Sequence, residues 1–260
     1  MDVLFFGVLV GLLVLAERVP WLQFQASPFL RRFFLSDFWY LATGAIFLSL
    51  AMRAQALPWA GILGKDILRA LESMPFALTV GAAVVLHDLG GYASHVLLHR
   101  IDMLWELHKV HHSSRTLDWL ATFRAHILEH ALRHFFSPVL LILLGFPLTA
   151  VGVASVLLGV WAVVVHANLN VTWRWLEPIL ITPRLHRLHH VPATSENNLG
   201  VFLSVWDRLR GTLVVDPAAQ LQPTGVPGAV ETYPQTWPRQ LIEPFTRKAE
   251  REQATYTAAA

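Results

Sequence analysis

Residues 95–113 read HVLLHRIDMLWELHKVHHS, with five histidines within eighteen positions. These form a pair four residues apart and then an H-x-x-H-H triplet: His95, His99, His108, His111 and His112. On an α-helix, a step of four residues returns a side chain to within about 40° of the same face, and a step of three to within about 60°. Each group is therefore predicted to point in one direction. Neutral imidazole is the commonest metal ligand, so the stretch predicts two groups that hold a metal from two sides.

A second H-x-x-H-H triplet follows at His186, His189 and His190. A lone histidine is more often a surface residue without a role, but the same spacing twice, beside an H-x-x-x-H pair, is specific. Eight imidazoles exceed the four to six ligands that fill the shell of one metal, so the sequence predicts two metals. A ligand set without carboxylates favours iron, zinc or copper over calcium or magnesium.

The composition indicates a membrane protein. Of 260 residues, 54% are hydrophobic and 15% are charged, against roughly 25% charged in an average soluble chain. The absence of cysteine excludes disulfides, thiolate ligands and iron–sulfur ligation by this chain. Electrons for a redox reaction must therefore come from another protein. The formal charge of +2, without a basic patch, argues against a nucleic-acid partner.

Four apolar stretches predict membrane-embedded segments: residues 3–16, 38–50, 76–86 (extended back to 67) and 135–165. The first lacks the basic start and the cleavage site of a signal peptide, so we interpret it as a short transmembrane or anchoring helix. The last would be roughly 46 Å long as one helix, against a hydrocarbon core of about 30 Å. Gly145-Phe146-Pro147 in its middle favours a helical hairpin instead.

A hairpin starts and finishes on one side of the membrane, so His126, His130 and His166 should share a face with residues 95–112. The distribution of Lys and Arg places this face in the cytoplasm. We therefore expect an all-α, multi-pass integral membrane protein with about four embedded segments and a histidine-rich cytoplasmic cap, in a bacterial inner membrane.

Three regions are expected along this chain. Residues 1–86 should form N-terminal transmembrane helices. Residues 87–212 should form the histidine-cluster catalytic domain, with the membrane hairpin at about 131–165. Residues 213–260 should form a C-terminal arm and tail: 213–237, rich in Pro and Gly, should be an extended arm over the surface, and 247–260 a frayed tail.

The histidine pattern resembles that of the membrane-bound fatty acid hydroxylase superfamily, the sterol desaturase-like, histidine-rich di-iron family. The resemblance covers about half the chain and extends beyond the histidines to these positions: Asp88, Tyr92, 104–113, 183–190, Asn198, Gly200, 206–208 and 211–212. It implies that the eight histidines hold two Fe ions, with Zn as a possible replacement on purification. It also implies that O2 is the co-substrate, that an external protein donates electrons, and that an unactivated C–H bond of a membrane lipid, such as a fatty acyl lipid or sterol, is hydroxylated or desaturated.

Three further residues follow from this comparison. His166 is a ninth candidate ligand, because some members carry a second H-x-x-x-H pair about twenty residues before the last triplet. Here the second position of that pair is Asn170, a departure, since an amide oxygen is a weaker ligand that can also hold a bound water. Asp88 is the carboxylate best placed to accept the second N–H of a ligand histidine; the rival interpretation is a helix-end cap near Gly90-Gly91.

Two rival functions stay open. His126, Glu129 and His130 read H-x-x-E-H, a loose pattern in which two histidines bind zinc and the glutamate acts as a base; this would be a membrane zinc hydrolase. We interpret His126 and His130 instead as residues that steady the ligands. The other rival is a non-enzymatic haem or metal carrier, although carriers tend to use isolated histidines on spanning helices.

Overall fold

In this computed structural model, residues 3–28, 30–55 and 65–246 are described. The described chain is all-α, as expected, and pairs as strand only in two isolated bridges, Gln23 with Leu169 and Leu180 with Leu203. Its helices are α1 (Val3–Ala16), α2 (Phe34–Gln55), α3 (Lys65–Glu72), α4 (Phe76–Arg100), α5 (Asp102–His112), α6 (Ile127–Leu143), α7 (Leu148–His166), α8 (Pro183–His190) and α9 (Val205–Arg210). A further helix occupies residues 237–246.

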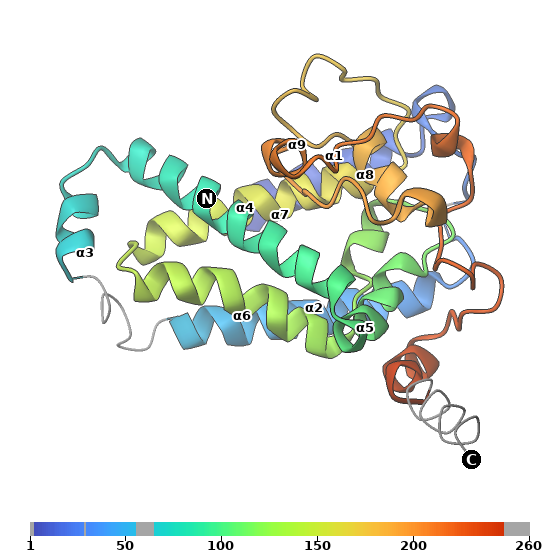
Figure 1. Cartoon of the computed structure of the whole chain (residues 1–260), viewed down its shortest axis with the longest axis horizontal. Helices are drawn as coiled ribbons and strands as arrows, with labels where there is room; N and C mark the ends of the chain where they lie inside the picture. The colour runs from blue at the N-terminus through green and yellow to red at the C-terminus, as the bar shows by residue number, and fades with distance from the viewer. Residues whose placement is uncertain (1–2, 29, 56–64, 247–260) are drawn as a thin grey trace.

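The long helices form an elongated bundle with a polar cap at one end. Helices α2, α4, α6 and α7 run along the long axis, while α5 and α8 lie toward one end and α3 lies at the other (Figure 1). Apolar side chains of α4, α6, α7 and the connection between the last two form the core of the bundle: Ala83, Leu141, Ile142, Phe146, Ala150, Val151 and Ala154. Small residues let helix backbones approach closely, which suits packing in a bilayer.

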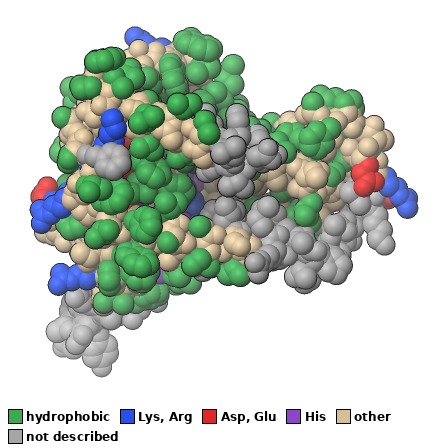
Figure 2. Space-filling view, turned by 180° about the vertical axis from the view of Figure 1, so that it is seen from behind, with side chains coloured by type: hydrophobic (Ala, Val, Ile, Leu, Met, Phe, Trp, Pro, Cys, Tyr) green, Lys and Arg blue, Asp and Glu red, His purple; other side chains and the backbone are tan. Residues whose placement is uncertain are grey.

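Two helices, α4 and α7, are long and apolar enough to cross a membrane. Several of their side chains are large, apolar and exposed: Leu78, Val85, Leu86, Leu89, Leu97 and Leu157. Figure 2 shows hydrophobic side chains over much of one face of the molecule, with charged side chains mostly toward its edges. In water such a surface would be costly, whereas lipid tails accept it. The embedding of α1 and α2 and the three-region division stay predictions.

The third apolar segment differs from its expected bounds. It does not extend back to residue 67, because Pro75 precedes the first residue of α4 and separates it from α3; a proline disfavours helical backbone at the residue before it. Instead α4 continues beyond residue 86 to Arg100 and carries His95 and His99 on its last two turns. Most of the polar side chains of α4 beyond residue 86 are buried against other segments of the chain. The composition of the helix itself does not reveal those contacts.

Helices α6 and α7 are joined by residues 144–147, where the chain reverses (Figure 1). Gly145 has φ of 99°, a conformation that glycine adopts at little cost, and Pro147 precedes the first turn of α7. The first residue of α6 and the last residue of α7 therefore lie toward the same end of the bundle.

Gly90 marks a close approach of α4 to α6, and it gives a direct test of the bundle. A Cβ on Gly90 would lie 2.5 Å from Ser137 Oγ and 2.8 Å from Ser137 Cβ, whereas a Cβ on Gly91 would meet nothing within 4 Å. We expect Gly90→Ala to destabilise the protein by about 1–3 kcal/mol through overpacking. Gly91→Ala should be neutral or stabilising by up to about 1 kcal/mol, because alanine favours helix. Thermal unfolding in detergent compares the two, and equal melting temperatures would refute this packing.

Candidate metal centre

Four helices converge on one buried region at the capped end of the bundle. Helix α4 contributes a histidine pair near its C-terminus, α7 contributes its last residue, and α5 and α8 contribute one triplet each. The nine side chains brought together are those singled out by spacing and resemblance: His95, His99, His108, His111, His112, His166, His186, His189 and His190. All nine are buried. Thirteen histidines in the chain thus leave four outside this region.

The nine histidines divide into two groups. The five-histidine cluster consists of His95, His99, His108, His112 and His189, and the four-histidine cluster of His111, His166, His186 and His190. Within each cluster, one nitrogen per ring lies within 4.8 Å of those of all other members. The clusters adjoin, since the rings of His112 and His190 stack with centroids 4.7 Å apart and those of His108 and His111 with centroids 5.1 Å apart.

Each H-x-x-H-H triplet supplies both clusters. In α5, His108 and His112 belong to the five-histidine cluster, while His111 turns to the four-histidine cluster. In α8 the assignment is reversed: His186 and His190 belong to the four-histidine cluster, and His189 belongs to the five-histidine cluster. Neighbouring residues on a helix point about 100° apart, so each H-H pair spans the two clusters. The expectation that each triplet points in one direction therefore needs correction.

Most of the rings are held by a hydrogen bond on the nitrogen remote from the cluster. Backbone carbonyls accept from Nδ1 in four cases: His95 to Leu199 at 2.6 Å, His111 to Arg124 at 2.9 Å, His166 to Ala162 at 2.7 Å and His189 to Asn197 at 3.1 Å. Since a carbonyl only accepts, these rings carry the proton on Nδ1 and present the Nε2 lone pair. Such outer contacts fix the tautomer and the orientation of metal ligands.

Carboxylates hold two more rings of the five-histidine cluster. Glu129 Oε1 accepts from His108 Nδ1 at 2.9 Å, and both side chains are fully buried. Glu196 Oε1 lies 3.4 Å from His99 Nδ1, and its own side chain is half exposed. Sequence reasoning considered Glu129 only as part of a separate zinc motif, and it did not single out Glu196.

The distances between nitrogens fit metal ligation. Nε2 of His166 lies 3.2 Å from that of His111 and 3.0 Å from that of His186, and Nε2 of His95 lies 3.0 Å from that of His108. At metal–nitrogen distances of about 2.0–2.1 Å, ligands 90–109° apart around one ion are separated by about 2.9–3.4 Å. The donor set therefore suits a metal in each cluster.

Burial favours the uncharged imidazole, which is the form that binds a metal, in three of these rings. Burial lowers the pKa of His112, His189 and His190 well below the usual value, and neighbouring histidines lower the pKa further. Several ring nitrogens facing this region, among them both nitrogens of His112 and Nε2 of His189, have no hydrogen-bond partner in the described structure. Unpartnered buried nitrogens are costly, and a bound metal satisfies them.

Two residues predicted to belong to the site, Asp88 and Asn170, lie outside both histidine clusters. Asp88 accepts from Trp206 Nε1 at 2.7 Å and from Leu203 N at 3.1 Å, and no contact with a histidine is recorded for it in the described structure. It anchors the segment before α9. Asn170 is exposed, and its backbone N–H donates to Leu22. Helix α7 ends at His166 and Ala167 is extended, so Asn170 does not follow His166 on a helical face, and the structure does not bring it into either cluster.

The H-x-x-E-H pattern does not form a cluster of its own in the described structure. His126 precedes the first turn of α6, where its Nδ1 accepts from Leu128 N and its Nε2 contacts Leu241 O at 3.1 Å. His130 Nε2 contacts Phe123 O at 3.2 Å. Glu129 instead turns to His108. The two histidines hold backbone segments, which agrees with a supporting role beside the ligands.

A tight turn after α8 aims one of the carbonyl acceptors. Asp207 accepts from Leu199 N, Gly200 N and Thr212 Oγ1 at 2.7–3.0 Å. Asn198 adopts φ of 53°, and a Cβ on Gly200 would lie 2.8 Å from Leu203 O. The close approach of Leu203 O leaves no room for a side chain at residue 200, so the turn needs glycine there. The turn directs Leu199 O toward His95 Nδ1.

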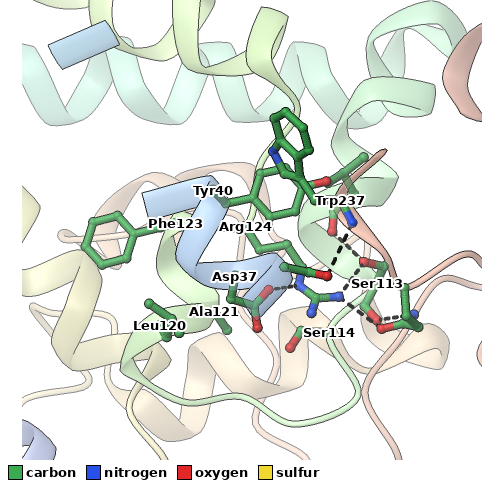
Figure 3. A network of polar contacts seen from close by, with 12 residues as sticks. Asp37, Tyr40, Ser113, Ser114, Leu120, Ala121, Phe123, Arg124 and Trp237 are labelled. Carbon is green, nitrogen blue, oxygen red and sulfur yellow. Dashed lines mark hydrogen bonds and ion pairs between the residues drawn. The ribbon is translucent and has the colours of Figure 1, made fainter. Parts of the chain in front are cut away.

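Part of the C-terminal region supports the metal centre. Arg124 donates to Asp37 at 2.5 Å, to Ser113 Oγ at 3.1 Å and to Gln235 at 3.0 Å (Figure 3), and Ser113 directly follows the first triplet. Gln240 donates to the same Ser113 Oγ at 2.7 Å. Within the stretch expected to form an arm over the surface, Gln235 is buried and satisfies buried groups; the arm as a whole stays a prediction.

Comparison with known proteins adds independent findings. Residues 80–212 match the family described as fatty acid hydroxylase. Ornithine lipid hydroxylase OlsE of Rhizobium tropici is 32% identical over 186 residues, which cover 70% of this chain and 54% of that protein. Alkylglycerol monooxygenase of Danio rerio is 32% identical over 128 residues, or 48% of this chain and 28% of that protein. The human alkylglycerol monooxygenase is 29% identical over 129 residues, with the same coverage. This chain thus spans about half, or less, of these relatives. No solved structure matches it.

Proposed function

This chain belongs to the fatty acid hydroxylase family, and from that membership we propose that it is a membrane-bound, O2-dependent hydroxylase of a membrane lipid. The resemblance seen in the sequence is thereby confirmed as family membership. The observation that carries the proposal is the pair of adjoining, buried, all-histidine clusters. The names of the relatives, a lipid hydroxylase and a monooxygenase, favour insertion of oxygen over desaturation.

We propose that each cluster holds one iron, with the five- and four-histidine clusters as ligand sets. Iron in such a pair supplies the activation of O2 toward an unactivated C–H bond. The residues of this chain supply the rest. Carbonyls and Glu129 orient the rings, and burial excludes water from a site in which a reactive oxidant must not be quenched. Zinc fits the same donors and can replace iron during purification.

The setting of the clusters supports a lipid as the substrate. The two helices long and apolar enough to span a membrane, α4 and α7, both end at the clusters. A lipid can thus reach the centre from the bilayer without crossing water. We propose that the clusters face the cytoplasm, where an external protein donates electrons, since the chain contains no cysteine to hold an iron–sulfur centre.

Metal content and oxygen labelling together test this proposal. Detergent-purified protein should contain about two metal ions per chain, and with iron, a reductant and a bacterial lipid extract it should give lipid products that carry ¹⁸O from ¹⁸O2. Label from H2¹⁸O instead would indicate a hydrolase, and two bound metals with no lipid change under ¹⁸O2 would indicate a carrier.

Glu129→Gln separates the hydroxylase from the zinc hydrolase. In a hydrolase, loss of the base should abolish activity. Here we expect a metal affinity lower by roughly 10–100-fold, as for other residues that orient a ligand histidine, with oxidation recovered at excess iron. Full loss of activity with unchanged metal affinity would contradict the role that we give to Glu129.

A further inference from the structure

Arg133 stands out because its guanidinium is partly exposed and has one ion pair in the described structure. It is four residues after Glu129 and four before Ser137, so the three side chains share one face of α6. Glu129 reaches His108 of α5, and Ser137 Oγ reaches His87 Nδ1 of α4 at 3.0 Å. Phe136 and Leu140, three and seven residues after Arg133, are exposed and are its neighbours on the helix surface. Arg133 therefore lies at the boundary between the packed face of α6 and its exposed apolar face, beside the carboxylate that holds His108.

The positive charge of Arg133 is close to the metal centre. Burial is the main cause that lowers the pKa of His186, and the neighbouring His166 and then Arg133 add to it. The pKa of His111 is lowered in the same way, with Arg133 again among the contributing charges. The ion pair with Glu129 at 3.5 Å places the guanidinium beside the carboxylate that holds His108.

This guanidinium is undersupplied with acceptors. Its one ion pair in the described structure is with Glu129 Oε1 at 3.5 Å, and that oxygen is also bound by His108 Nδ1 at the shorter distance of 2.9 Å. The arginines buried in ion pairs differ. Arg31 and Arg184 each bind a carboxylate through two nitrogens. A guanidinium carries five N–H donors, and the side chain of Arg133 is 26% exposed, so part of it stays accessible to a ligand.

We propose that Arg133 binds the oxyanion of an anionic lipid substrate and thereby positions the lipid at the metal centre. The planar fork of donors on arginine matches a carboxylate or a phosphate. A partly exposed cation beside an exposed apolar helix face suits a lipid, whose oxyanion the guanidinium can bind while the acyl chain packs on that face. Because Glu129 contacts both Arg133 and His108, an oxyanion bound there lies one side chain away from a ligand of the five-histidine cluster. This inference rests on the proposed function, and it implies that oxidation occurs near the polar end of the lipid.

Lipid binding measured by native mass spectrometry tests the inference. The wild-type protein, as purified, is titrated in detergent with oleate, with phosphatidic acid and with phosphatidylcholine. In Arg133→Gln we expect affinity for the oxyanion lipid to fall roughly tenfold or more, as for loss of a charge-assisted hydrogen bond, and affinity for phosphatidylcholine to stay unchanged. Loss for oleate alone identifies a carboxylate, and loss for phosphatidic acid alone identifies a phosphate. Unchanged affinity for both lipids overturns the inference.

Two controls keep the result specific. Arg115→Gln removes an arginine whose pair with Glu231 is solvent-accessible, and it should leave all three affinities unchanged. Arg133→Lys keeps the charge without the fork and should retain intermediate affinity. If Arg133→Gln does not fold, phenylglyoxal modification of the wild type replaces it. Oleate or phosphatidic acid should slow the reaction at Arg133 but not at Arg115, and equal rates with and without lipid would reject the site.

The outcome is independent of the proposed reaction. If the protein binds two metals and oxidises lipid while Arg133→Gln keeps its affinity for anionic lipids, the inference fails and the function stands. If Arg133→Gln loses that affinity in a protein that inserts no ¹⁸O, the lipid site stands and the function fails.

Discussion

Replacing His111 by alanine is expected to remove metal from the four-histidine cluster, whereas replacing its neighbour His112 removes metal from the five-histidine cluster. Each variant should retain about one of the two metals, because the other cluster keeps all of its imidazoles, whereas the altered cluster loses a ligand and binds its metal more weakly. Lipid oxidation should fall by a hundredfold or more in both, on the order of the loss of a group required for catalysis. The same division is expected between His190→Ala and His189→Ala.

Elemental analysis gives the count, and the spectrum of the remaining metal identifies which cluster is occupied. With ⁵⁷Fe, the Mössbauer spectra of His111→Ala and His112→Ala should differ, since the first reports the five-histidine cluster and the second the four-histidine cluster. His126→Gln is the matched control, because His126 binds backbone groups rather than a cluster, and it should keep both metals. Identical residual spectra in the two alanine variants would show that the clusters are not separate sites.

The nine clustered histidines were all found from sequence, but their division was not. Spacing places His108, His111 and His112 within one half of a helix, which is enough to identify candidate ligands. Whether His111 joins the others depends on where the ends of α7 and α8 lie, because His166 and His186 are its partners. Helical periodicity describes directions around one axis, and it carries no information on what surrounds that axis.

The same limit explains the carboxylates. Asp88 lies about two turns before His95 and was expected to support a histidine, but its carboxylate accepts from Trp206 and Leu203, more than a hundred residues later in the chain. Glu129 takes that role because α6 packs against α5. A carboxylate among the residues that resemble the family is therefore no better a candidate for supporting a ligand histidine than a carboxylate elsewhere in the chain, unless the helix packing is known.

Asn170 lies outside both clusters for a local reason. The H-x-x-x-H comparison assumes that the helix continues for one turn after the first histidine. Helix α7 ends at His166, and the chain then pairs with residues near Gln23 through Leu169. Asn168, two residues earlier, is buried and exchanges hydrogen bonds with Gln25. Sequence spacing gave no signal for this contact, since its partner lies near the other end of the chain.

Buried polar groups behind the first triplet connect segments that are far apart in sequence. Ser113 follows His112 directly, and it is bound by Arg124, Gln235 and Gln240. The backbone of Arg124 in turn accepts from His111. Hydrogen bonds are directional, and a satisfied network of this kind rigidifies what it contacts. The C-terminal region therefore contributes to the precision of the ligand set without supplying a ligand.

Replacement of Arg124 by methionine is the variant outside the clusters that should damage the protein most. Its guanidinium is 1% exposed and binds the fully buried Asp37, which would be left with Arg31 alone. Removing one partner of a buried ion pair costs about 3–5 kcal/mol, because the remaining charge stays buried. Ser113 and Gln235 would also lose the hydrogen bond that Arg124 donates to each of them. We therefore expect weaker metal binding at the neighbouring His111 and His112.

The chain offers a matched control for that variant. Arg115 also joins the histidine region to the C-terminal region, through Glu231 at 2.7 Å, but its side chain is 35% exposed. Exposed pairs contribute only about 0–1 kcal/mol, so Arg115→Gln should leave thermal unfolding in detergent nearly unchanged. In Arg124→Met the midpoint should fall clearly, and Asp37→Asn in the same chain should restore part of it by removing the stranded charge. If Arg124→Met unfolds at the same temperature as Arg115→Gln, the buried network does not hold the C-terminal region to the metal centre.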